Sequence, residues 1–389
     1  MDKAIVVGGS NGIGLSISNV LMQKNFFVQI IDIVEPDRKN LISEQYTYIN
    51  CNLLDFDNSL FESLSQDDSV KAVMVTAGFG RIADFDSLHI AEIDNILNVN
   101  SIAGIKIARC FYDRLKNDES FYFGMMGSIA GLINSPMFSV YAASKAALCR
   151  FIESVNIELE VSESPNRILN VSPGAMKGTN FHGGSNNPEE NKELARQIVS
   201  HLTKSETLFI PQYNEIFKKV IERYQADPHK FGLESYQYKK DSRRVEKECQ
   251  LCIGYLSGTF DLFHIGHLNL LKRAKSQCDY LIVGVHESGS WKKKETFIPF
   301  EERLEIVNTC KYVDQAVTSC PEDSDAWDLW HYNRLFVGSD YKGTERFNRY
   351  EEFFAGKNVQ IVYFPYTKST SSTQLRGIIT EITNGTSTL

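Results

Sequence analysis

The chain has 389 residues, of which 42% are hydrophobic and 23% are charged, and its formal net charge at pH 7 is −8. This length allows two or three domains with sizeable cores, and the acidic balance argues against a nucleic-acid partner, which would call for a basic face. We find neither a signal peptide nor an apolar run of the ~18 residues that a membrane span needs, so we expect a soluble, cytoplasmic protein without a membrane partner.

The chain opens with a glycine-rich turn between a strand and a helix. An apolar run at residues 4–7 precedes the turn, and helical periodicity follows over residues 15–23. A second apolar run, residues 27–31, ends in Asp32. A glycine turn in this context favours dinucleotide binding, and an acidic residue at that place can accept hydrogen bonds from both ribose hydroxyls while repelling a 2′-phosphate. We therefore predict NAD as the cofactor, with NADH favoured over NADPH.

A serine, a tyrosine and a lysine then occur at suggestive spacings. Tyr141 and Lys145 are four residues apart and share a helical face, and Ser128 precedes Tyr141 by thirteen residues. An ammonium beside a tyrosine lowers the pKa of the phenol, which helps proton exchange near neutral pH. Ser128 can donate to a substrate oxygen as its charge develops. Taken alone, such a helical pair is usually just a solvated face.

Together these patterns resemble the short-chain dehydrogenase/reductase family over about residues 1–225. Thr76 and Asn52 depart from the asparagine and aspartate usual at those places, but both keep small hydrogen-bonding side chains. The resemblance implies a catalytic set made of Asn100, Ser128, Tyr141 and Lys145. It implies cofactor binding by Gly8, Gly12, Ile13, Gly14, Asp32, Asn52, Leu53, Ala77, Gly78, Tyr141, Lys145, Pro173 and Gly174.

The next stretch is less informative. Residues 178–191 are rich in Gly, Asn and Pro and are interpreted as a mobile lid, followed by helices at about 188–202 and 216–224. We place the first domain at residues 1–228, a linker at 229–249 and the second domain at 250–389. Four basic residues of the linker could touch a phosphate, although a solvated connector is the favoured interpretation; they are Lys239, Lys240, Arg243 and Arg244.

The eight cysteines are scattered, which indicates reduced cytosolic usage rather than a disulfide framework. Cys249-x-x-Cys252 could indicate a zinc or redox site. Cys252, however, enters an apolar strand, and the chain has no second pair at ligand spacing. We therefore predict no metal site held by the protein.

A ten-residue run, residues 258–267, connects an apolar strand to a helix in the second domain. Such a turn directs unpaired backbone N–H groups toward a bound phosphate. His264 and His267 share one face of the first helical turn, and Gly258 and Gly266 leave room for a triphosphate. A zinc half-site is the alternative, but neither a carboxylate nor a cysteine lies at ligand spacing beside the histidines.

The G-T-F-D and H-x-G-H sequences of this run resemble the cytidylyltransferase family, especially the glycerol-3-phosphate cytidylyltransferases, over about residues 250–378. Those enzymes join CTP to an alcohol phosphate and release pyrophosphate. The resemblance implies catalytic roles for His264, His267 and one of three lysines at 292–294, taken as Lys294. It implies nucleotide binding by Gly258, Thr259, Phe260, His264, Gly266, His267, Lys294, Arg303, Thr370, Ser371 and Ser372. Tyr366 and Lys368 depart from the family's closing segment.

We thus predict two fused α/β domains, an N-terminal Rossmann doubly wound parallel sheet and a C-terminal Rossmann-like nucleotidyltransferase. The simplest joint hypothesis is reduction of a keto or aldehyde sugar phosphate to an alditol phosphate, followed by its coupling to CTP with Mg²⁺. The product, CDP-ribitol or CDP-glycerol, would feed teichoic-acid-like or capsular polymers. In one alternative the first domain is a non-catalytic scaffold or sensor; in another the nucleotide is ATP. Because both families self-associate, we expect a homodimer or homotetramer.

Overall fold

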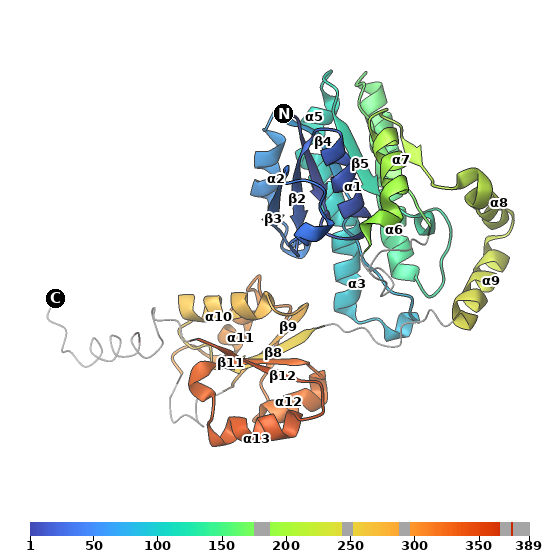
Figure 1. Cartoon of the computed structure of the whole chain (residues 1–389). Coiled ribbons are helices and arrows are strands. Elements are labelled where there is room, and N and C mark those ends of the chain that lie inside the picture. Colours follow the sequence, from blue (N-terminus) through green and yellow to red (C-terminus); the bar gives the residue numbers. More distant parts are fainter. Residues whose placement is uncertain (175–186, 243–251, 288–295, 366–374, 376–389) are drawn as a thin grey trace. The chain divides into compact units, whose positions relative to one another are not determined.

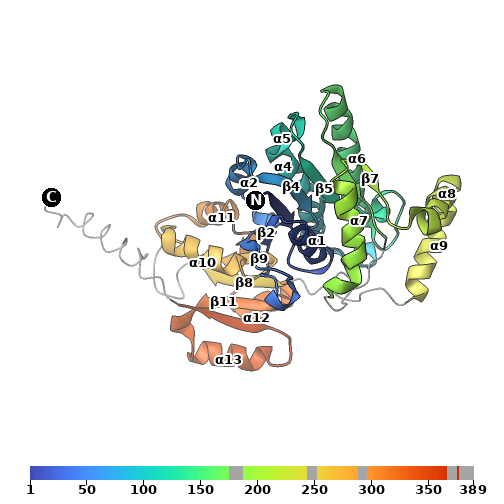
Figure 2. The ribbon, with the colours of Figure 1, turned by 45° about the horizontal axis from the view of Figure 1, so that its top comes forward.

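The computed structural model describes residues 1–174, 187–242, 252–287, 296–365 and 375. The chain divides into two compact units, residues 1–249 and 250–389, each built around its own parallel sheet (Figures 1 and 2). The α/β class predicted for both domains is confirmed.

The first unit holds a seven-stranded sheet in the order β3-β2-β1-β4-β5-β6-β7. Its strands are β1 (Lys3–Val7), β2 (Phe27–Asp32), β3 (Tyr46–Asn50), β4 (Val70–Val75), β5 (Tyr122–Met126), β6 (Ile168–Val171) and β7 (Leu208–Phe209). Its helices are α1 (Gly12–Gln23), α2 (Asn58–Ser65), α3 (Ile90–Leu97), α4 (Ala103–Cys110), α5 (Tyr112–Lys116), α6 (Ser139–Val161), α7 (Lys192–Leu202), α8 (Lys218–Ala226) and α9 (Pro228–Asp241).

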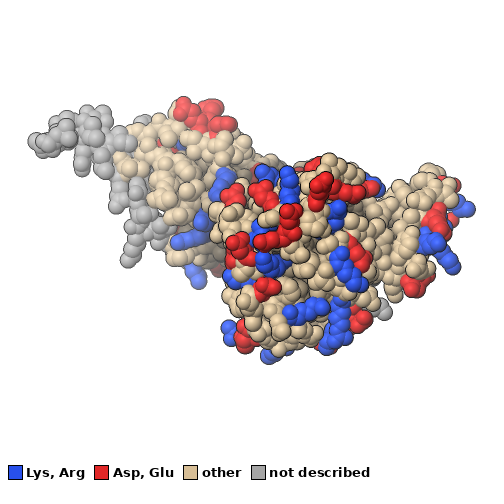
Figure 3. All heavy atoms as spheres, turned by 90° about the horizontal axis from the view of Figure 1, so that it is seen from above, with Lys and Arg blue, Asp and Glu red and all other residues tan. Residues whose placement is uncertain are grey.

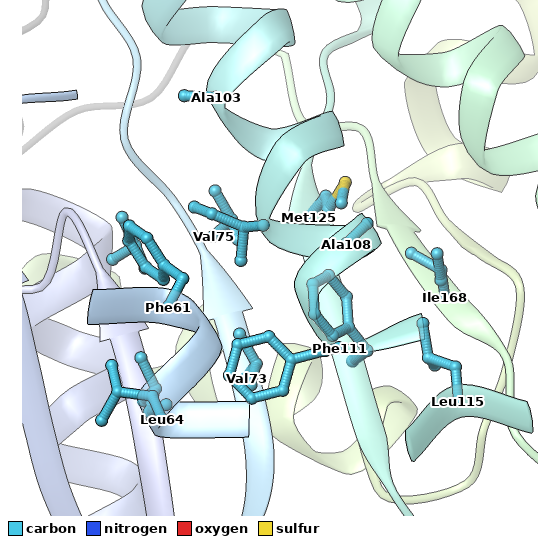
Figure 4. Close-up of a cluster of buried hydrophobic side chains, with 14 of the residues drawn as sticks. Phe61, Leu64, Val73, Val75, Ala103, Ala108, Phe111, Leu115, Met125 and Ile168 are labelled. Carbon is cyan, nitrogen blue, oxygen red and sulfur yellow. The ribbon is translucent and has the colours of Figure 1, made fainter. Parts of the chain in front are cut away.

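Both faces of this sheet are covered, because successive strand residues point to opposite sides. Ala4 and Val6 of β1 pack with α1 and α7, which lie side by side (Figures 1 and 2). Ile5 belongs to the core on the other face, under α2, α4 and α6. Figure 4 shows part of this second core, to which Phe61 and Leu64 of α2 and Val73 and Val75 of β4 contribute. The continuous apolar runs of the strands follow from burial on two sides.

The strand order fixes where a ligand can bind. β1 lies between β2 and β4, so successive connections leave it in opposite directions across the sheet. A crevice opens at the carboxyl ends of parallel strands at such a reversal point. The glycine turn after β1 and the segment after β4 both lie at this edge.

One boundary differs from the prediction. Most of the segment expected to be a solvated linker, residues 229–249, forms helix α9, with bounds Pro228–Asp241. The side chain of Lys239 donates to the Ser135 hydroxyl at 2.6 Å, so α9 is packed on the first unit. A polar and charged composition indicated solvent exposure, but an amphiphilic lysine can cover a protein surface with its stem.

The second unit holds a five-stranded sheet in the order β10-β9-β8-β11-β12. Its strands are β8 (Ile253–Gly258), β9 (Tyr280–Val285), β10 (Gln315–Thr318), β11 (Arg334–Gly338) and β12 (Gln360–Phe364). Its helices are α10 (Ile265–Lys275), α11 (Phe300–Asn308), α12 (Asp323–Trp330) and α13 (Glu345–Phe354). The order reverses between β8 and β11, which places the run after β8 at the carboxyl edge where ligands bind.

Within the described ranges no helix is both long and apolar enough to cross a membrane. On the face shown in Figure 3, acidic and basic side chains are interspersed rather than gathered into one basic surface. The cysteines that the structure describes are free thiols. Cys249 lies outside the described residues, so the Cys249/Cys252 pair is not described.

Candidate active sites

The turn after β1 requires its glycines. Gly8 and Gly12 have φ of +81° and +51°, a backbone region that favours glycine. A Cβ at Gly14 would lie 2.1 Å from the Gly8 carbonyl oxygen, so α1 could not approach the turn with any larger residue. Thr76 fixes the other side of the turn, because its hydroxyl donates to that same carbonyl at 3.0 Å. Ile13, in the first turn of α1, packs on the core beneath.

The carboxylate of Asp32 lies beside this turn. It accepts the backbone N–H of Ser10 at 3.0 Å and that of Ile33 at 2.7 Å. The Ser10 hydroxyl oxygen is buried and has no partner among the described residues. A bare glycine turn, an orphaned hydroxyl and an adjacent carboxylate fit the pyrophosphate and ribose of a dinucleotide. Nothing in this arrangement is specific to a 2′-phosphate.

Other predicted cofactor residues line the same edge. Asn52 follows β3 and caps a short turn by accepting the Leu54 N–H at 3.0 Å, while Leu53 is buried. The N–H of Ala77 donates to the Val7 carbonyl at 3.1 Å. The residues that follow β1, β3 and β4 therefore lie at the same edge of the sheet.

Tyr141 and Lys145 of α6 are both buried, and so is Ser128, which precedes a short helical turn. Lys145 Nζ donates to the Met126 carbonyl at 2.8 Å and lies 5.8 Å from the centroid of the Tyr141 ring. Burial raises the pKa of Tyr141 to about 12, and a hydrogen bond with Ser128 partly opposes this shift. Burial lowers the pKa of Lys145 to about 8.

The expected direction of the tyrosine pKa shift was therefore wrong for the protein alone. Spacing indicated that Lys145 would stabilise the phenolate of Tyr141. In the structure the ammonium is turned toward a backbone carbonyl of β5, and desolvation disfavours the charged form of both groups. Tyr141 is consequently a protonated acid at neutral pH.

Asn100 holds the segment that faces this pair. It lies in a π-helical turn, Asn98–Ile102, a feature frequent at functional sites. Its side-chain amide donates to the Phe79 carbonyl at 2.8 Å and to the Ser144 hydroxyl at 3.1 Å. A Cβ at Gly78 would lie 3.1 Å from both the Asn100 oxygen and Lys145 Nζ, so glycine admits these groups to the site.

The Pro173-Gly174 turn follows β6 and borders the segment that begins at Ser128. The Pro173 carbonyl accepts the Ile129 N–H at 3.0 Å, which ties this turn to the segment after Ser128. A Cβ at Gly174 would lie 2.3 Å from the Phe217 ring. Most of the lid predicted at residues 178–191 lies outside the described residues.

In the second unit His264 caps helix α10. Its Nδ1 accepts the Gly266 N–H at 3.0 Å, which caps the helix and orients the imidazole ring. The His264 and His267 rings are stacked with centroids 4.0 Å apart. Burial lowers the pKa of His264. Gly258, the last residue of β8, opens the same edge of the sheet.

His267 is enclosed by two aromatic rings. Its ring centroid lies 5.3 Å from that of Phe260 and 5.5 Å from that of Phe263. Burial, and secondarily the neighbouring His264, lowers the pKa of His267 to about 4, so the ring is neutral at pH 7. Its Nδ1 is buried without a partner among the described residues. Phe260 and Leu262 both have a φ of +52°, the kind of backbone strain that clusters at functional sites.

Arg303, in α11, connects several backbone segments around the second site. It is fully buried, and its guanidinium donates to the carbonyl groups of four residues at 2.5–2.9 Å. These are Ile298, Thr259, His286 and Glu287. These bonds hold the backbone around the run after β8, which is the supporting role that the family resemblance implies for this arginine.

Asp261 has a positioning role that sequence reasoning missed. Its carboxylate accepts the N–H groups of Phe297 at 3.1 Å and Ile298 at 3.0 Å, which fixes the segment before α11. Its place inside the G-T-F-D sequence was the available signal. Lys294, Thr370, Ser371 and Ser372 lie outside the described residues. Among the residues that are described, no group of three or more His, Cys, Asp or Glu is arranged to hold a metal ion.

Two family models match the chain, "short chain dehydrogenase" over residues 2–190 and "Cytidylyltransferase-like" over residues 255–378. The glycerol-3-phosphate cytidylyltransferase of Bacillus subtilis (strain 168) is 34% identical over 123 residues, which cover 31% of this chain and 90% of that protein. The ethanolamine-phosphate cytidylyltransferase of Dictyostelium discoideum is 40% identical over 92 residues, covering 22% of this chain and 26% of its own. An uncharacterized oxidoreductase of Saccharomyces cerevisiae, TDA5, is 26% identical over 187 residues, which cover 46% of this chain and 56% of that protein.

Proposed function

The chain belongs to the short-chain dehydrogenases through its first unit and to the cytidylyltransferase-like enzymes through its second, and from that premise we propose one two-step reaction sequence. The first unit reduces a keto or aldehyde sugar phosphate to an alditol phosphate. The second unit couples that product to CTP and releases pyrophosphate. The observation that carries the proposal is the presence on one chain of two clusters of polar side chains at sheet edges, one around Tyr141 and one around His267.

In the first step, the glycine turn after β1 and Asp32 would hold NADH, which when bound would supply a hydride to the carbonyl carbon of the substrate. Tyr141 gives its proton to the carbonyl oxygen, for which a pKa of about 12 keeps it in the acidic form. Ser128 donates to the same oxygen as negative charge develops. Asp32 holds the ribose hydroxyls and disfavours a 2′-phosphate, which supports NADH over NADPH.

In the second step, an oxygen of the alditol phosphate attacks the α-phosphorus of CTP in line, and the bond to pyrophosphate breaks. The protein mainly positions the reactants and stabilises charge. A neutral His267 can donate its ring N–H to a phosphate oxygen. Lys294 and the segment 370–372 are proposed to close over the phosphates, with Mg²⁺ carried by the triphosphate.

The names of the relatives support the substrate class. The Bacillus subtilis and Dictyostelium discoideum proteins are cytidylyltransferases that act on alcohol phosphates, glycerol 3-phosphate and ethanolamine phosphate. An alditol phosphate is the alcohol phosphate that a carbonyl reductase can make. We propose that the CDP-alditol, of the CDP-ribitol or CDP-glycerol type, is made in the cytoplasm and consumed in teichoic-acid-like or capsular polymer synthesis.

The assembly proposed is a homodimer or homotetramer. Apolar side chains on α3 and α6 lie in solvent, with Ile90 75%, Ile157 60% and Val161 80% exposed. These helices correspond to the ones through which short-chain reductases commonly pair. Covering such residues is a common reason for closed symmetric association.

Mass spectrometry of the products formed from CTP, NADH and a panel of ketose phosphates tests the whole sequence. We expect a CDP-alditol to form together with NADH oxidation, and no nucleotide product when the ketose phosphate is left out. Cytidylyl transfer to a supplied alditol phosphate, without NADH oxidation by any ketose phosphate, would leave the first unit as a scaffold. Transfer from ATP but not CTP would overturn the choice of nucleotide.

A further inference from the structure

Helix α9 contacts the segment that links Ser128 to the helix carrying Tyr141. The Asn134 side-chain amide donates to the Pro228 carbonyl at 2.7 Å, at the start of α9. A Cβ at Gly232 would lie 3.0 Å from the same amide, so α9 approaches the segment closely. The last element of the first unit therefore borders the reductase site.

Near the end of α9, Lys239 reaches this segment with its ammonium group. Nζ donates to the Ser135 hydroxyl at 2.6 Å and to the Pro136 carbonyl at 2.7 Å. Both partners are neutral, and an ammonium has three N–H donors. Within the described part of the chain, no carboxylate lies at ion-pair distance from Lys239.

A half-buried cation without a counter-ion is unfavourable, because desolvation disfavours its charged form. Burial lowers the pKa of Lys239 to about 8. Arg81 in the same unit shows the usual solution, since its guanidinium lies 2.7 Å from the carboxylate of Glu92. Lys239 differs from Arg81 in that its partners among the described residues are neutral oxygens.

The segment that holds Lys239 is connected to the proton donor. The Ser135 carbonyl accepts the Phe138 N–H at 3.0 Å. The Phe138 ring stacks on the Tyr141 ring with centroids 4.1 Å apart. Through Phe138, the Ser135 turn is therefore connected to Tyr141 by one backbone hydrogen bond and one ring contact.

We propose that Lys239, with the Ser135 hydroxyl, binds the phosphate group of the reductase's substrate. This inference rests on the proposed reduction of a sugar phosphate and names the residue that selects the phosphorylated substrate. A phosphate dianion offers the desolvated ammonium the charge-assisted partner it lacks, and lysine serves well as a point charge for phosphate. Helix α9 is then a specificity element added after the last strand of the sheet.

The test compares Lys239→Gln, Lys239→Arg and the matched control Lys240→Gln, whose side chain is exposed one residue away. Each variant is assayed with a ketose phosphate and with the same ketose lacking phosphate. We expect the ratio of the two kcat/KM values to fall roughly ten- to hundred-fold in Lys239→Gln, the range for a lost hydrogen bond to a charged group. Lys239→Arg should recover part of the ratio, and Lys240→Gln should not change it.

Inorganic phosphate provides a second readout. It should inhibit the native protein in competition with the ketose phosphate and inhibit Lys239→Gln much more weakly. NADH binding, a property of the unit that carries Lys239, reports that each variant is folded. An equal loss for both substrates in Lys239→Gln would show that Lys239 only anchors the segment, and would overturn the inference. Failure of the native protein to reduce any ketose phosphate would instead overturn the proposed function.

Discussion

Replacing Arg303 by methionine separates a supporting role from direct nucleotide binding. The change removes hydrogen bonds to four backbone carbonyls and leaves those acceptors in a buried environment. Each unsatisfied buried acceptor costs about 1–3 kcal/mol. Removing the cation also removes its own desolvation penalty, which offsets part of this loss. We therefore expect the second unit to lose about 3 kcal/mol of unfolding free energy.

A loss of this size is a large share of the ~5–15 kcal/mol that stabilises a typical domain. For a unit of this length it corresponds to a fall in Tm of roughly 10 °C. Thermal unfolding followed by cytidylyl-transfer activity measures it, while reductase activity reports the first unit and should persist. Arg349→Met, at an exposed arginine of α13, is the matched control. Unchanged stability combined with weakened CTP binding in Arg303→Met would show direct nucleotide contact and refute the supporting role.

Three further predictions concern the two sites and the assembly. Tyr141→Phe should lower the rate of reduction at least ~10²-fold because it removes the proton donor, while cytidylyl transfer continues. His267→Ala should lower the rate of cytidylyl transfer while reduction continues. Loss of both reactions in either folded variant would contradict independent sites. NADH should give a higher kcat/KM than NADPH, and Asp32→Ala should narrow the gap by removing the charge that repels the 2′-phosphate; equal efficiency in the native protein would refute this role. The double change Ile157→Glu and Val161→Glu should dissociate the assembly in light scattering at micromolar concentration, whereas a monomeric native protein would rule out self-association.

The features predicted well from the sequence are those set by local geometry. Glycine at positions 8, 12 and 14 follows from positive φ and a contact across a single turn. His264 and His267 share a helical face because their spacing along the chain dictates it. Apolar runs bounded by such turns mark strands of a parallel sheet, and the carboxyl ends of those strands gather the site.

The features that escaped prediction depend on contacts between distant segments. The raised pKa of Tyr141 reflects how deeply α6 is buried and where the Lys145 ammonium points, neither of which the four-residue spacing determines. Arg303 finds the carbonyl of Thr259, 44 residues earlier in the chain. Lys239 stands in a charged, tyrosine-rich stretch whose composition is that of a connector, and its partner Ser135 is 104 residues away. Sequence patterns report short-range periodicity, whereas the destination of a long side chain is set by the folded surface it meets.

The two proposed reactions place opposite demands on one phosphate group. In the reduction, the phosphate is a handle that Lys239 binds while the chemistry occurs at a carbonyl near Tyr141. In the transfer, the same phosphate is the nucleophile and must approach CTP beside His267 with an oxygen free. The alditol phosphate therefore has to leave Lys239 before it can react again. The neutral oxygens of Ser135 and Pro136 accept hydrogen bonds from the Lys239 ammonium. When the product leaves, Lys239 can return to these two partners, which the fold keeps in place. Lys239 can therefore bind the phosphate group specifically during reduction and still release the alditol phosphate for cytidylyl transfer.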